Sequence, residues 1–460
     1  MKILAIETSC DDTAISIVEV KDSDKGLIFS AQGRPTLSGK VLAHNISSQI
    51  KIHQKWGGVV PNLAKREHGK NLVPILIKSL EEAGFSTASK SKILASSKSD
   101  LAPASPRLRG ASTRNTTSDH RSQNLEKKLE KILEREPELK KQFLAIIPTL
   151  KIPKIDAVAV TKGPGLEPAL WVGINFAKAL ALIWDLPLYP VNHLEGHVLA
   201  VLANPKSEIR NPKLKGKNKK NTPSSSKTKN SLFPVISLIV SGGHTELVLS
   251  KDWLKYKIIG RTRDDAVGEA FDKVARILGL HYPGGPEISK LAEKFSTERP
   301  RLSVSPHSPL RGEASQFTKL PRPMLHSGDF DFSFSGLKTA VLYLVQKLKQ
   351  ENKFDEKIKA EIAYDFQQAT IEVLVAKTLS ASQKFKAQTI IAGGGVIANT
   401  ALREALAQMA SKNNLKLLIP ELAYSTDNAT MIALAAGLRL LAGQQKTSHT
   451  FKADGNLNLK

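Results

Sequence analysis

The chain has 460 residues, 41% of them hydrophobic, with 67 Lys and Arg against 43 Asp and Glu, a formal net charge of +24. This composition excludes a chain that is disordered throughout, and the single cysteine, Cys10, excludes a disulfide scaffold or a Cys-based zinc cluster. No apolar run approaches the roughly 20 residues that span a bilayer. The N-terminus, MKILAIETSC, has no basic segment before a long apolar one, so we expect no signal peptide, no membrane partner and a cytoplasmic location.

Predicted strands and helices alternate along the chain. The first are strands at 3–8 and 14–20, which flank a polar turn. A strand at 155–161 and a helix that ends near Trp184 follow. The last are strands at 233–243 and 246–250, which flank glycines, then a strand at 389–395 and a helix from Asn399. This alternation is typical of an α/β fold. Because the strand–turn–strand unit occurs twice, at 3–20 and at 235–250, we expect two similar lobes that face a cleft.

Three basic stretches differ in composition from the rest of the chain. Residues 86–123 carry seven Lys and Arg against two Asp, residues 205–230 nine against one Glu, and residues 299–322 five against one Glu. Together they hold +17 of the net charge of +24, and they lack hydrophobic periodicity, so we expect disordered surface insertions. The first borders a predicted surface helix at 124–145. The insertions either add salt-sensitive contacts to a nucleic acid or are solvated loops.

Two histidines, His193 and His197, are spaced i and i+4, which places both imidazoles on one face of a helix where they can share a metal ion. Two surface histidines would show the same spacing by chance. The motif is not the H-E-x-x-H of metalloproteases, because Glu195 follows the first histidine by two positions. Asp427 precedes an apolar helix and is interpreted as an N-cap or first-turn residue, although its carboxylate is free to complete a metal site.

Glycine turns and one acidic helix are candidates for nucleotide binding. Ser241 to Thr245 joins two strands, and Gly395 and Asn399 lie where a strand gives way to a helix, which are places where backbone N–H groups can approach a phosphate. Each of these could equally be an ordinary tight turn. Asp272 shares a helix face with Glu269 and could bind ribose hydroxyls, or both could simply begin a charged helix. The sequence has neither a Walker A motif nor a Rossmann fingerprint.

Nine motifs in order carry a resemblance across nearly the whole chain outside the insertions. They are IETSCDDT, WGGVVPNLAKREH, GPGLEPALWVGINFAKALA, NHLEGH, IVSGGHTEL, DDAVGEAFDKVARILGLHYPGGP, FDFSFSGLKTA, AGGGVIAN and STDNATMIA. With them the chain resembles the tRNA N6-adenosine threonylcarbamoyltransferase (TsaD) family. The family usually has Glu at the position of Asn62, and the three insertions are outside its pattern.

The resemblance implies the actin-like ATPase (ASKHA) fold, in which two RNase H-like lobes enclose a nucleotide cleft. The expected first lobe is 1–190, with an insertion at 86–152. The expected second lobe is 191–445, with insertions at 205–230 and 299–322, and its last helix can pack back on the first lobe. Residues 446–460 are expected to form a tail.

The resemblance also implies an enzyme that transfers threonylcarbamoyl from threonylcarbamoyl-adenylate to N6 of adenosine 37 in tRNAs that read codons starting with A, with release of AMP. The implied metal ligands are His193, His197 and Asp427, which would hold one divalent ion, Fe²⁺ in preference to Zn²⁺. The implied donor-binding residues are Ile239, Val240, Ser241, Gly242, Gly243, Asp272, Gly285 and Asn399. Asp11 is the candidate catalytic acid or base. The implied partners are tRNA, the paralogous protein TsaB and the small ATPase TsaE.

Three alternative functions differ in what they require. A metal-dependent peptidase needs a general base beside the metal, which HLEGH does not supply. A small-molecule kinase of the same fold would have no paired histidines at a metal site. A non-catalytic tRNA-binding scaffold would have no need to keep both histidines and Asp427.

Overall fold

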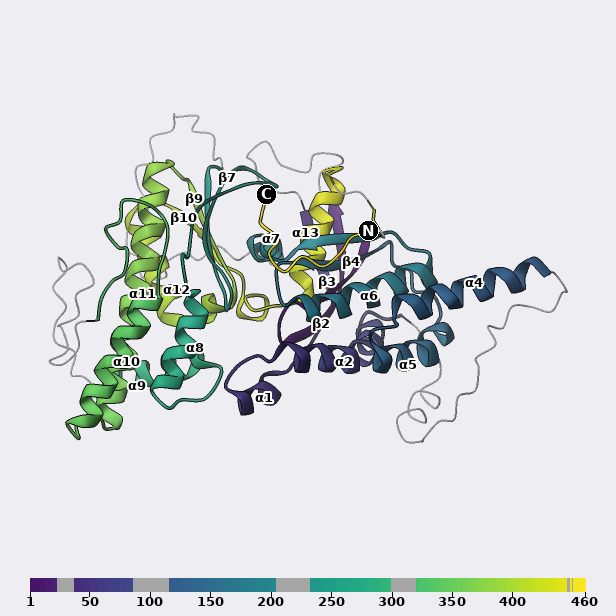
Figure 1. The fold of residues 1–460 in the computed structure, drawn as a ribbon. Helices are drawn as coiled ribbons and strands as arrows, with labels where there is room; N and C mark the ends of the chain where they lie inside the picture. The colour runs from purple at the N-terminus through teal and green to yellow at the C-terminus, as the bar shows by residue number, and fades with distance from the viewer. Residues whose placement is uncertain (23–36, 86–115, 204–231, 299–319, 445–446, 449) are drawn as a thin grey trace, which may run out of the picture.

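The computed structural model describes residues 1–22, 37–85, 116–203, 232–298, 320–444, 447–448 and 450–460. Two mixed sheets of five strands organise these residues (Figure 1). The first sheet contains β1 (Lys2–Glu7), β2 (Asp12–Asp22), β3 (Leu37–Ser48), β4 (Ala157–Gly163) and β5 (Leu188–Asn192). The second contains β6 (Val235–Val240), β7 (Thr245–Asp252), β8 (Lys255–Arg261), β9 (Thr389–Gly393) and β10 (Lys416–Leu418).

The two sheets have the same topology. The orders are β3-β2-β1-β4-β5 and, read in the matching direction, β8-β7-β6-β9-β10. In each sheet the first three strands in sequence form an antiparallel meander, the fourth pairs in parallel with the first, and the fifth pairs in parallel with the fourth. The predicted α/β fold with two similar lobes is therefore confirmed, and it is the ASKHA architecture that the resemblance implies.

The first lobe consists of the first sheet and the helices that cover one of its faces. These are α1 (Ile50–His53), α2 (Pro61–Glu82), α4 (Thr116–Ile132), α5 (Pro137–Ile146) and α6 (Glu167–Trp184). Leu72 and Leu76 of α2 and Phe176 of α6 pack against Ile15 and Ile17 of β2, and all five side chains are fully buried. Burying apolar side chains on this scale is the main stabilisation that such a lobe receives.

Two helices lie on the other face of the first sheet, toward the second lobe. They are α7 (His193–Leu199) and α13 (Ala429–Leu441), the last helix of the chain. Leu434 and Leu438 of α13 share one core cluster with Val18 of β2 and Ile239 of β6, and this helix packs directly against the first sheet and α7, which explains why it is apolar. A Cβ added at Gly437 would come within 2.9 Å of Val20, so glycine is required for this close approach.

The second lobe consists of the second sheet and five helices. They are α8 (Val267–Ile277), α9 (Gly284–Glu298), α10 (Ser335–Gln350), α11 (Glu356–Lys384) and α12 (Thr400–Lys412). Short 3-10 turns complete the two lobes at Gln54–Trp56, Ile147–Thr149, Ala200–Ala203, Gly395–Ala398 and Leu422–Tyr424. Residues 450–460 pack against the first lobe, where Leu459 is buried. Within the described ranges, no helix is long and apolar enough to cross a membrane.

The insertions are more ordered at their ends than the sequence predicts. The predicted surface helix at 124–145 is two helices, and α4 begins at Thr116, inside the stretch expected to be disordered. Pro137 begins the second helix, as proline favours a first helical position. Leu133 and Phe143 are fully buried against the first lobe, which the surface prediction missed because charged residues surround them in sequence.

The third insertion is also ordered at its end. Leu320 is buried, and Arg322 donates to Glu372 at 2.8 Å. Residues 86–115, 205–230 and 299–319 of the three stretches lie outside the described residues.

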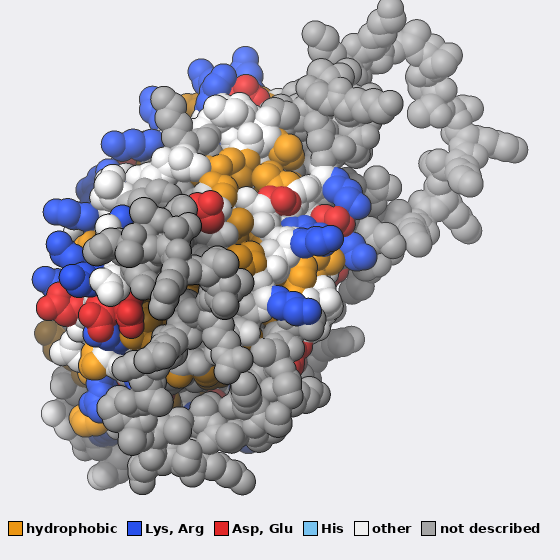
Figure 2. All heavy atoms as spheres, turned by 90° about the vertical axis from the view of Figure 1, so that its right-hand side faces the viewer, with side chains coloured by type: hydrophobic (Ala, Val, Ile, Leu, Met, Phe, Trp, Pro, Cys, Tyr) orange, Lys and Arg blue, Asp and Glu red, His pale blue; other side chains and the backbone are white. Residues whose placement is uncertain are grey.

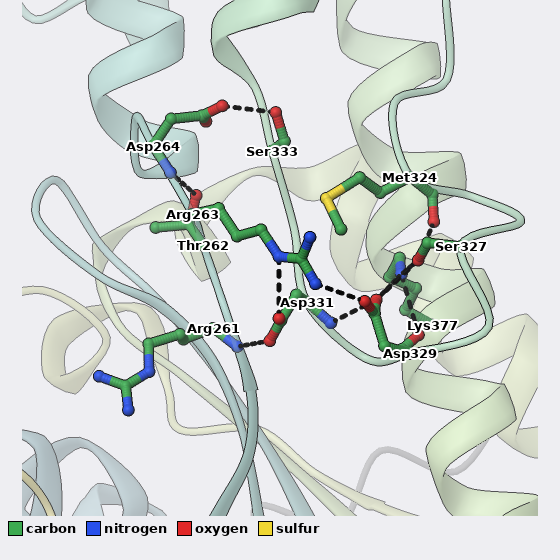
Figure 3. Close-up of polar contacts among 10 residues, drawn as sticks. All are labelled: Arg261, Thr262, Arg263, Asp264, Met324, Ser327, Asp329, Asp331, Ser333 and Lys377. Atoms are coloured by element: carbon green, nitrogen blue, oxygen red, sulfur yellow. Dashed lines mark hydrogen bonds and ion pairs between the residues drawn. The ribbon is translucent and has the colours of Figure 1, made fainter.

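A network of ion pairs fixes the loop that precedes α10 (Figure 3). Arg263 donates to Asp329 at 2.6 Å and to Asp331 at 3.0 Å, and Lys377 of α11 donates to the Asp329 carbonyl at 3.0 Å. The Asp264 carboxylate accepts from Ser333 and from the backbone N–H groups of Phe334 and Ser335 at the start of α10. The FDFSFSGLKTA motif is thereby held to the segment that leads from β8 into α8.

Candidate metal and nucleotide site

A cavity of about 450 Å³ lies between the two lobes. Two turns that occupy equivalent places in the duplicated topology line it: Ser9 to Asp12, between β1 and β2, and Ser241 to His244, between β6 and β7. The glycine turns after β4 and β9 contribute Gly165 and Gly395, and the C-terminal segment contributes Gly455 and Asn456. His193, Tyr282 and Asp427 also line this cavity, so the structure brings together seven of the nine motifs.

The predicted metal ligands converge at the inner end of the cavity. His193 is the first residue of α7, whose start is capped by the Asn192 side chain through the Leu194 N–H at 2.8 Å. His197 follows one turn later. The Nε2 atoms of His193 and His197 lie 3.4 Å and 3.2 Å from Oδ1 of Asp427, and one ligand atom from each residue falls within 4.8 Å of the others.

Asp427 reaches this position from the segment before α13. The interpretation of Asp427 as an N-cap is wrong, because the side chain of Asn428 caps α13 by accepting from the Met431 N–H at 3.0 Å. With the capping role filled by its neighbour, the Asp427 carboxylate is directed to the histidines.

Glu7, at the end of β1, is a functional residue that the sequence analysis did not identify. It is fully buried, and its Oε2 lies 2.9 Å from Nδ1 of His193, while Thr161 and the Ser9 N–H donate to the same carboxylate. Although burial opposes charge at both groups, the carboxylates of Glu7 and Asp427 raise the pKa of His193 to about 10. Because two carboxylates face the same imidazole, positive charge is favoured at His193.

The residues present fit a divalent metal ion. His197 is fully buried, its Nε2 faces only the Asp427 carboxylate, and its Nδ1 has no hydrogen-bond partner among the described residues, which is unusual for a buried polar group. A ligated His193 would receive at its other ring nitrogen the carboxylate partner that metal-bound histidines typically have, here Glu7. Glu195 points elsewhere, because it accepts from Arg439 at 2.7 Å, so it is not a general base beside the metal.

Two adjacent carboxylates, Asp11 and Asp12, enter the cavity from the first-lobe turn. Burial and the charge of Asp427 raise the pKa of Asp11, which accepts from the Tyr282 hydroxyl at 3.2 Å. Burial raises the pKa of Asp12 to about 7, and its Oδ1 has no hydrogen-bond partner among the described residues. The sequence analysis identified Asp11 alone, because burial at a turn has no signature in sequence.

Of the predicted donor-binding residues, the second-lobe turn lies in the cavity. Gly242 and Gly243 are exposed, with open space where a Cβ would be, so a ligand can approach their backbone closely. His244 lies in the same wall, and burial lowers its pKa to about 4, so it is neutral at physiological pH. Ile239 and Val240 are strand residues with fully buried side chains.

Asp272, Gly285 and Asn399 lie outside the lining of this cavity. Asp272 of α8 accepts from the Gly284 N–H at 2.7 Å, and burial raises its pKa to about 6. The loop that it holds also carries Tyr282, which does line the cavity. Gly285 is free of close neighbours at its Cβ position.

Asn399 lines a neighbouring cavity of about 560 Å³ and caps α12 by accepting from the Leu402 N–H at 2.9 Å. Its amide also donates to Ser289 and Gln367, both at 2.8 Å. Asn62, the departure from the family pattern, is exposed in the first turn of α2, away from both cavities.

Comparison with known proteins gives one family. The profile of TsaD, tRNA N6-adenosine threonylcarbamoyltransferase, matches residues 40–98, 133–215 and 222–434. The enzyme of that name from Paraburkholderia xenovorans (strain LB400) is 38% identical over 440 residues, 96% of this chain and 92% of that one. The one from Thermosipho africanus (strain TCF52B) is 37% identical over 459 residues, the full length of both. Among solved structures, component A of the Acidaminococcus fermentans (R)-2-hydroxyglutaryl-CoA dehydratase has a TM-score of 0.38 and 10% identity, over 96% of this chain and 99% of that one.

Proposed function

Because the chain belongs to the tRNA N6-adenosine threonylcarbamoyltransferase family, we propose that it transfers threonylcarbamoyl from threonylcarbamoyl-adenylate to N6 of adenosine 37 in tRNAs that read codons starting with A, with release of AMP. The observation that carries this proposal is the cavity between the lobes. There a buried His-His-Asp cluster, an acidic turn and a glycine turn meet within about 450 Å³. An adenylate needs an anion-binding turn, and acyl transfer needs a positioned electrophile and a proton acceptor.

The donor lies across the cleft in this proposal. Its phosphate faces the backbone of Ser241 to Gly243, where the absence of side chains allows close approach. Asp272, Gly285 and Asn399 act from the second lobe on the adenosine end, Asp272 through the loop that it holds. The backbone of Ile239 and Val240 leads into the glycine turn and sets its direction.

His193, His197 and Asp427 would hold one divalent metal ion. Two histidines and one carboxylate with open positions are the ligand set typical of Fe²⁺, and Zn²⁺ accepts the same donors, so Fe²⁺ is the favoured ion. The ion would supply a Lewis acid for the oxygens of the carbamoyl or carboxylate group. Glu7 fixes the orientation of His193 from behind.

The acidic turn moves the proton. As N6 of the adenosine attacks the carbamoyl carbon, the new C–N bond forms and the bond from that carbon to the phosphate oxygen breaks, with its electron pair leaving on AMP. The amine proton passes to a carboxylate of the first-lobe turn, Asp11 or Asp12. A pKa of about 7 suits Asp12 to this task near neutral pH, while Asp11 is engaged by Tyr282.

The remaining assignments follow from the same proposal. The chain works on tRNA in the cytoplasm, with the paralogous protein TsaB and the small ATPase TsaE as partners. We take residues 1–190 and 191–445 as the two lobes and 446–460 as a tail, a division that falls within β5, three residues before α7 begins. A peptidase has less support, because Glu195 is paired with Arg439 rather than placed as a base.

Reconstitution tests the proposed function. The purified chain, threonylcarbamoyl-adenylate and unmodified tRNA are incubated with and without TsaB and TsaE, and modified adenosine and AMP are measured by mass spectrometry. We expect equal amounts of both products, and their loss in His197→Ala. Absence of modified adenosine from the wild type with all partners present would contradict the proposal.

A further inference from the structure

A second candidate site, outside the catalytic cavity, lies on the first lobe. It is a cavity of about 760 Å³ between α4, the C-terminal half of α6 and the C-terminal segment. We call it the basic cavity, because its lining includes Lys128, Lys131, Arg135, Lys178 and Lys452. On the end of the molecule that carries α4, Lys and Arg side chains stand beside hydrophobic ones (Figure 2).

The positive charge of the basic cavity is not neutralised from within. Its lining holds only two acidic residues, Glu134 and Asp185, against five basic ones. None of the five basic side chains forms an ion pair with a residue that the structure describes, whereas the neighbouring Lys65 and Lys140 pair with Glu136 and Glu130. Clustered cations without partners favour a polyanionic ligand, because each phosphate contact releases counterions.

The inner wall of the basic cavity strengthens an interaction with an anion. Lys178 is half-buried, with its Nζ 5.6 Å from the centre of the Trp171 ring and 2.8 Å from the carbonyl of Phe451, to which it donates. Burial lowers the pKa of Lys178 because water is partly excluded there. Electrostatic attraction is stronger in such a place than at a fully solvated surface.

The basic cavity and the catalytic cavity share two elements. Leu166, immediately before α6, lines the catalytic cavity, and Lys178 lies 12 residues later, which is about 18 Å along a helix. In the C-terminal segment, Lys452 lines the basic cavity and Asn456 the catalytic one, and four residues span at most about 14 Å. At about 3.4 Å of strand per phosphate, these distances correspond to about four to five nucleotides.

From this geometry we propose that the basic cavity binds the sugar-phosphate backbone of the tRNA, about four to five nucleotides from the adenosine that enters the catalytic cavity. The proposal rests on the proposed function. Lys128 and Lys131 fall in the gap between residues 98 and 133 of the family profile, so this part of the site is an addition of this chain. The helix α4, which begins inside the first insertion, thus forms one wall of the proposed tRNA-binding cavity.

Salt-dependent tRNA binding tests the proposal. The triple variant Lys128→Gln, Lys131→Gln, Lys452→Gln removes three exposed charges without touching the buried core. The matched control Lys251→Gln, Lys357→Gln, Lys412→Gln removes three exposed charges from the second lobe. We expect the slope of log Kd against log salt to fall by roughly two to three, and Kd at low salt to rise at least about tenfold, in the first variant alone.

Two further measurements, the kinetic constants of the reaction and the binding of TsaB, distinguish a tRNA site from a site for a protein partner. In the reconstituted reaction, the first variant should raise the KM for tRNA and leave both the KM for threonylcarbamoyl-adenylate and the kcat at saturating tRNA unchanged. If the two variants have equal slopes of log Kd against log salt and equal KM for tRNA, the proposal is overturned. If the first variant loses TsaB binding without a change in tRNA binding, the basic cavity binds a protein partner instead. Neither result touches the proposed function, which fails only if the wild type forms no modified adenosine.

Discussion

The turn between β1 and β2 and the turn between β6 and β7 occupy the same place in two sheets of identical topology, yet they differ at every position after the first serine. The first reads Ser-Cys-Asp-Asp and supplies two half-buried carboxylates. The second reads Ser-Gly-Gly-His and supplies open backbone and a neutral imidazole. Both line one cavity.

The difference indicates a division of labour between two similar lobes. The carboxylates of the first-lobe turn suit proton transfer, while the second-lobe turn can accept a phosphate and carries only a weak base, His244, whose pKa is lowered by burial to about 4. A duplicated scaffold thus places an acidic and an anion-binding turn opposite each other, with the His-His-Asp cluster at the inner end. Each of the following changes alters one side of this arrangement.

The largest effect is expected from the metal ligands. His197→Ala should lower the rate of modified-adenosine formation by at least about 100-fold, because the proposed metal cluster loses one of its three ligands. Metal content per chain, measured by mass spectrometry, should fall in parallel. The exposed His326→Ala is the control and should keep both values. Full activity in a metal-free His197→Ala protein would exclude the cluster from the reaction.

Asp12→Asn is the sharpest change to the first-lobe turn. We expect kcat/KM to fall about 100-fold, the usual contribution of a general base. In the wild type, kcat/KM should fall as the pH drops below about 7, because protonation of Asp12 removes the acceptor. In Asp12→Asn this fall of kcat/KM at low pH should disappear. If kcat/KM of Asp12→Asn still falls below about pH 7, another group is the proton acceptor, and Asp11→Asn is the next variant to test.

Glu7→Gln tests the support of the metal from the first lobe. The change keeps the shape of the side chain but removes the charge that faces His193, so metal affinity should fall about 10-fold to 100-fold. Competition with a chelator of known affinity measures this. Glu19→Gln, on the exposed part of β2, should leave it unchanged. An unchanged affinity in Glu7→Gln would mean that Glu7 serves the fold alone.

Gly268→Ala should have the smallest effect, on the second-lobe turn only. A Cβ at Gly268 would lie 2.6 Å from the Ser241 carbonyl and 2.8 Å from the Gly242 Cα, so the turn must shift. We expect KM for threonylcarbamoyl-adenylate to rise about tenfold, in line with a displaced binding group, with metal content unchanged. Gly336→Ala, which meets nothing within 4 Å, is the control. A fall in kcat at constant KM would instead mean that the second-lobe turn acts in the transfer step rather than in donor binding.

Local patterns predicted the parts of the fold and site that are continuous in sequence. The apolar runs of β1, β2, β6 and β7 and the i, i+4 spacing of the two histidines were sufficient for these elements. The edge strand β3 was missed because its residues are mixed and half-exposed, and β5 because it is short and contains Pro190.

Features that depend on contacts between distant segments could not be predicted. Glu7 and His193 are separated by 186 residues, and only the pairing of β1 with β4 and of β4 with β5 brings them together. The basic cavity is a further case, because α4, α6 and the C-terminal segment meet only in the folded chain.

A single-turnover experiment tests the division of labour most directly. The chain is loaded with labelled threonylcarbamoyl-adenylate, unmodified tRNA is added, and donor binding and modified adenosine are measured in the same sample for the wild type, Asp12→Asn and Gly268→Ala. We predict that Asp12→Asn binds the donor like the wild type but transfers slowly, whereas Gly268→Ala binds weakly and transfers normally once saturated. Weak donor binding in Asp12→Asn with normal transfer at saturation would contradict the account.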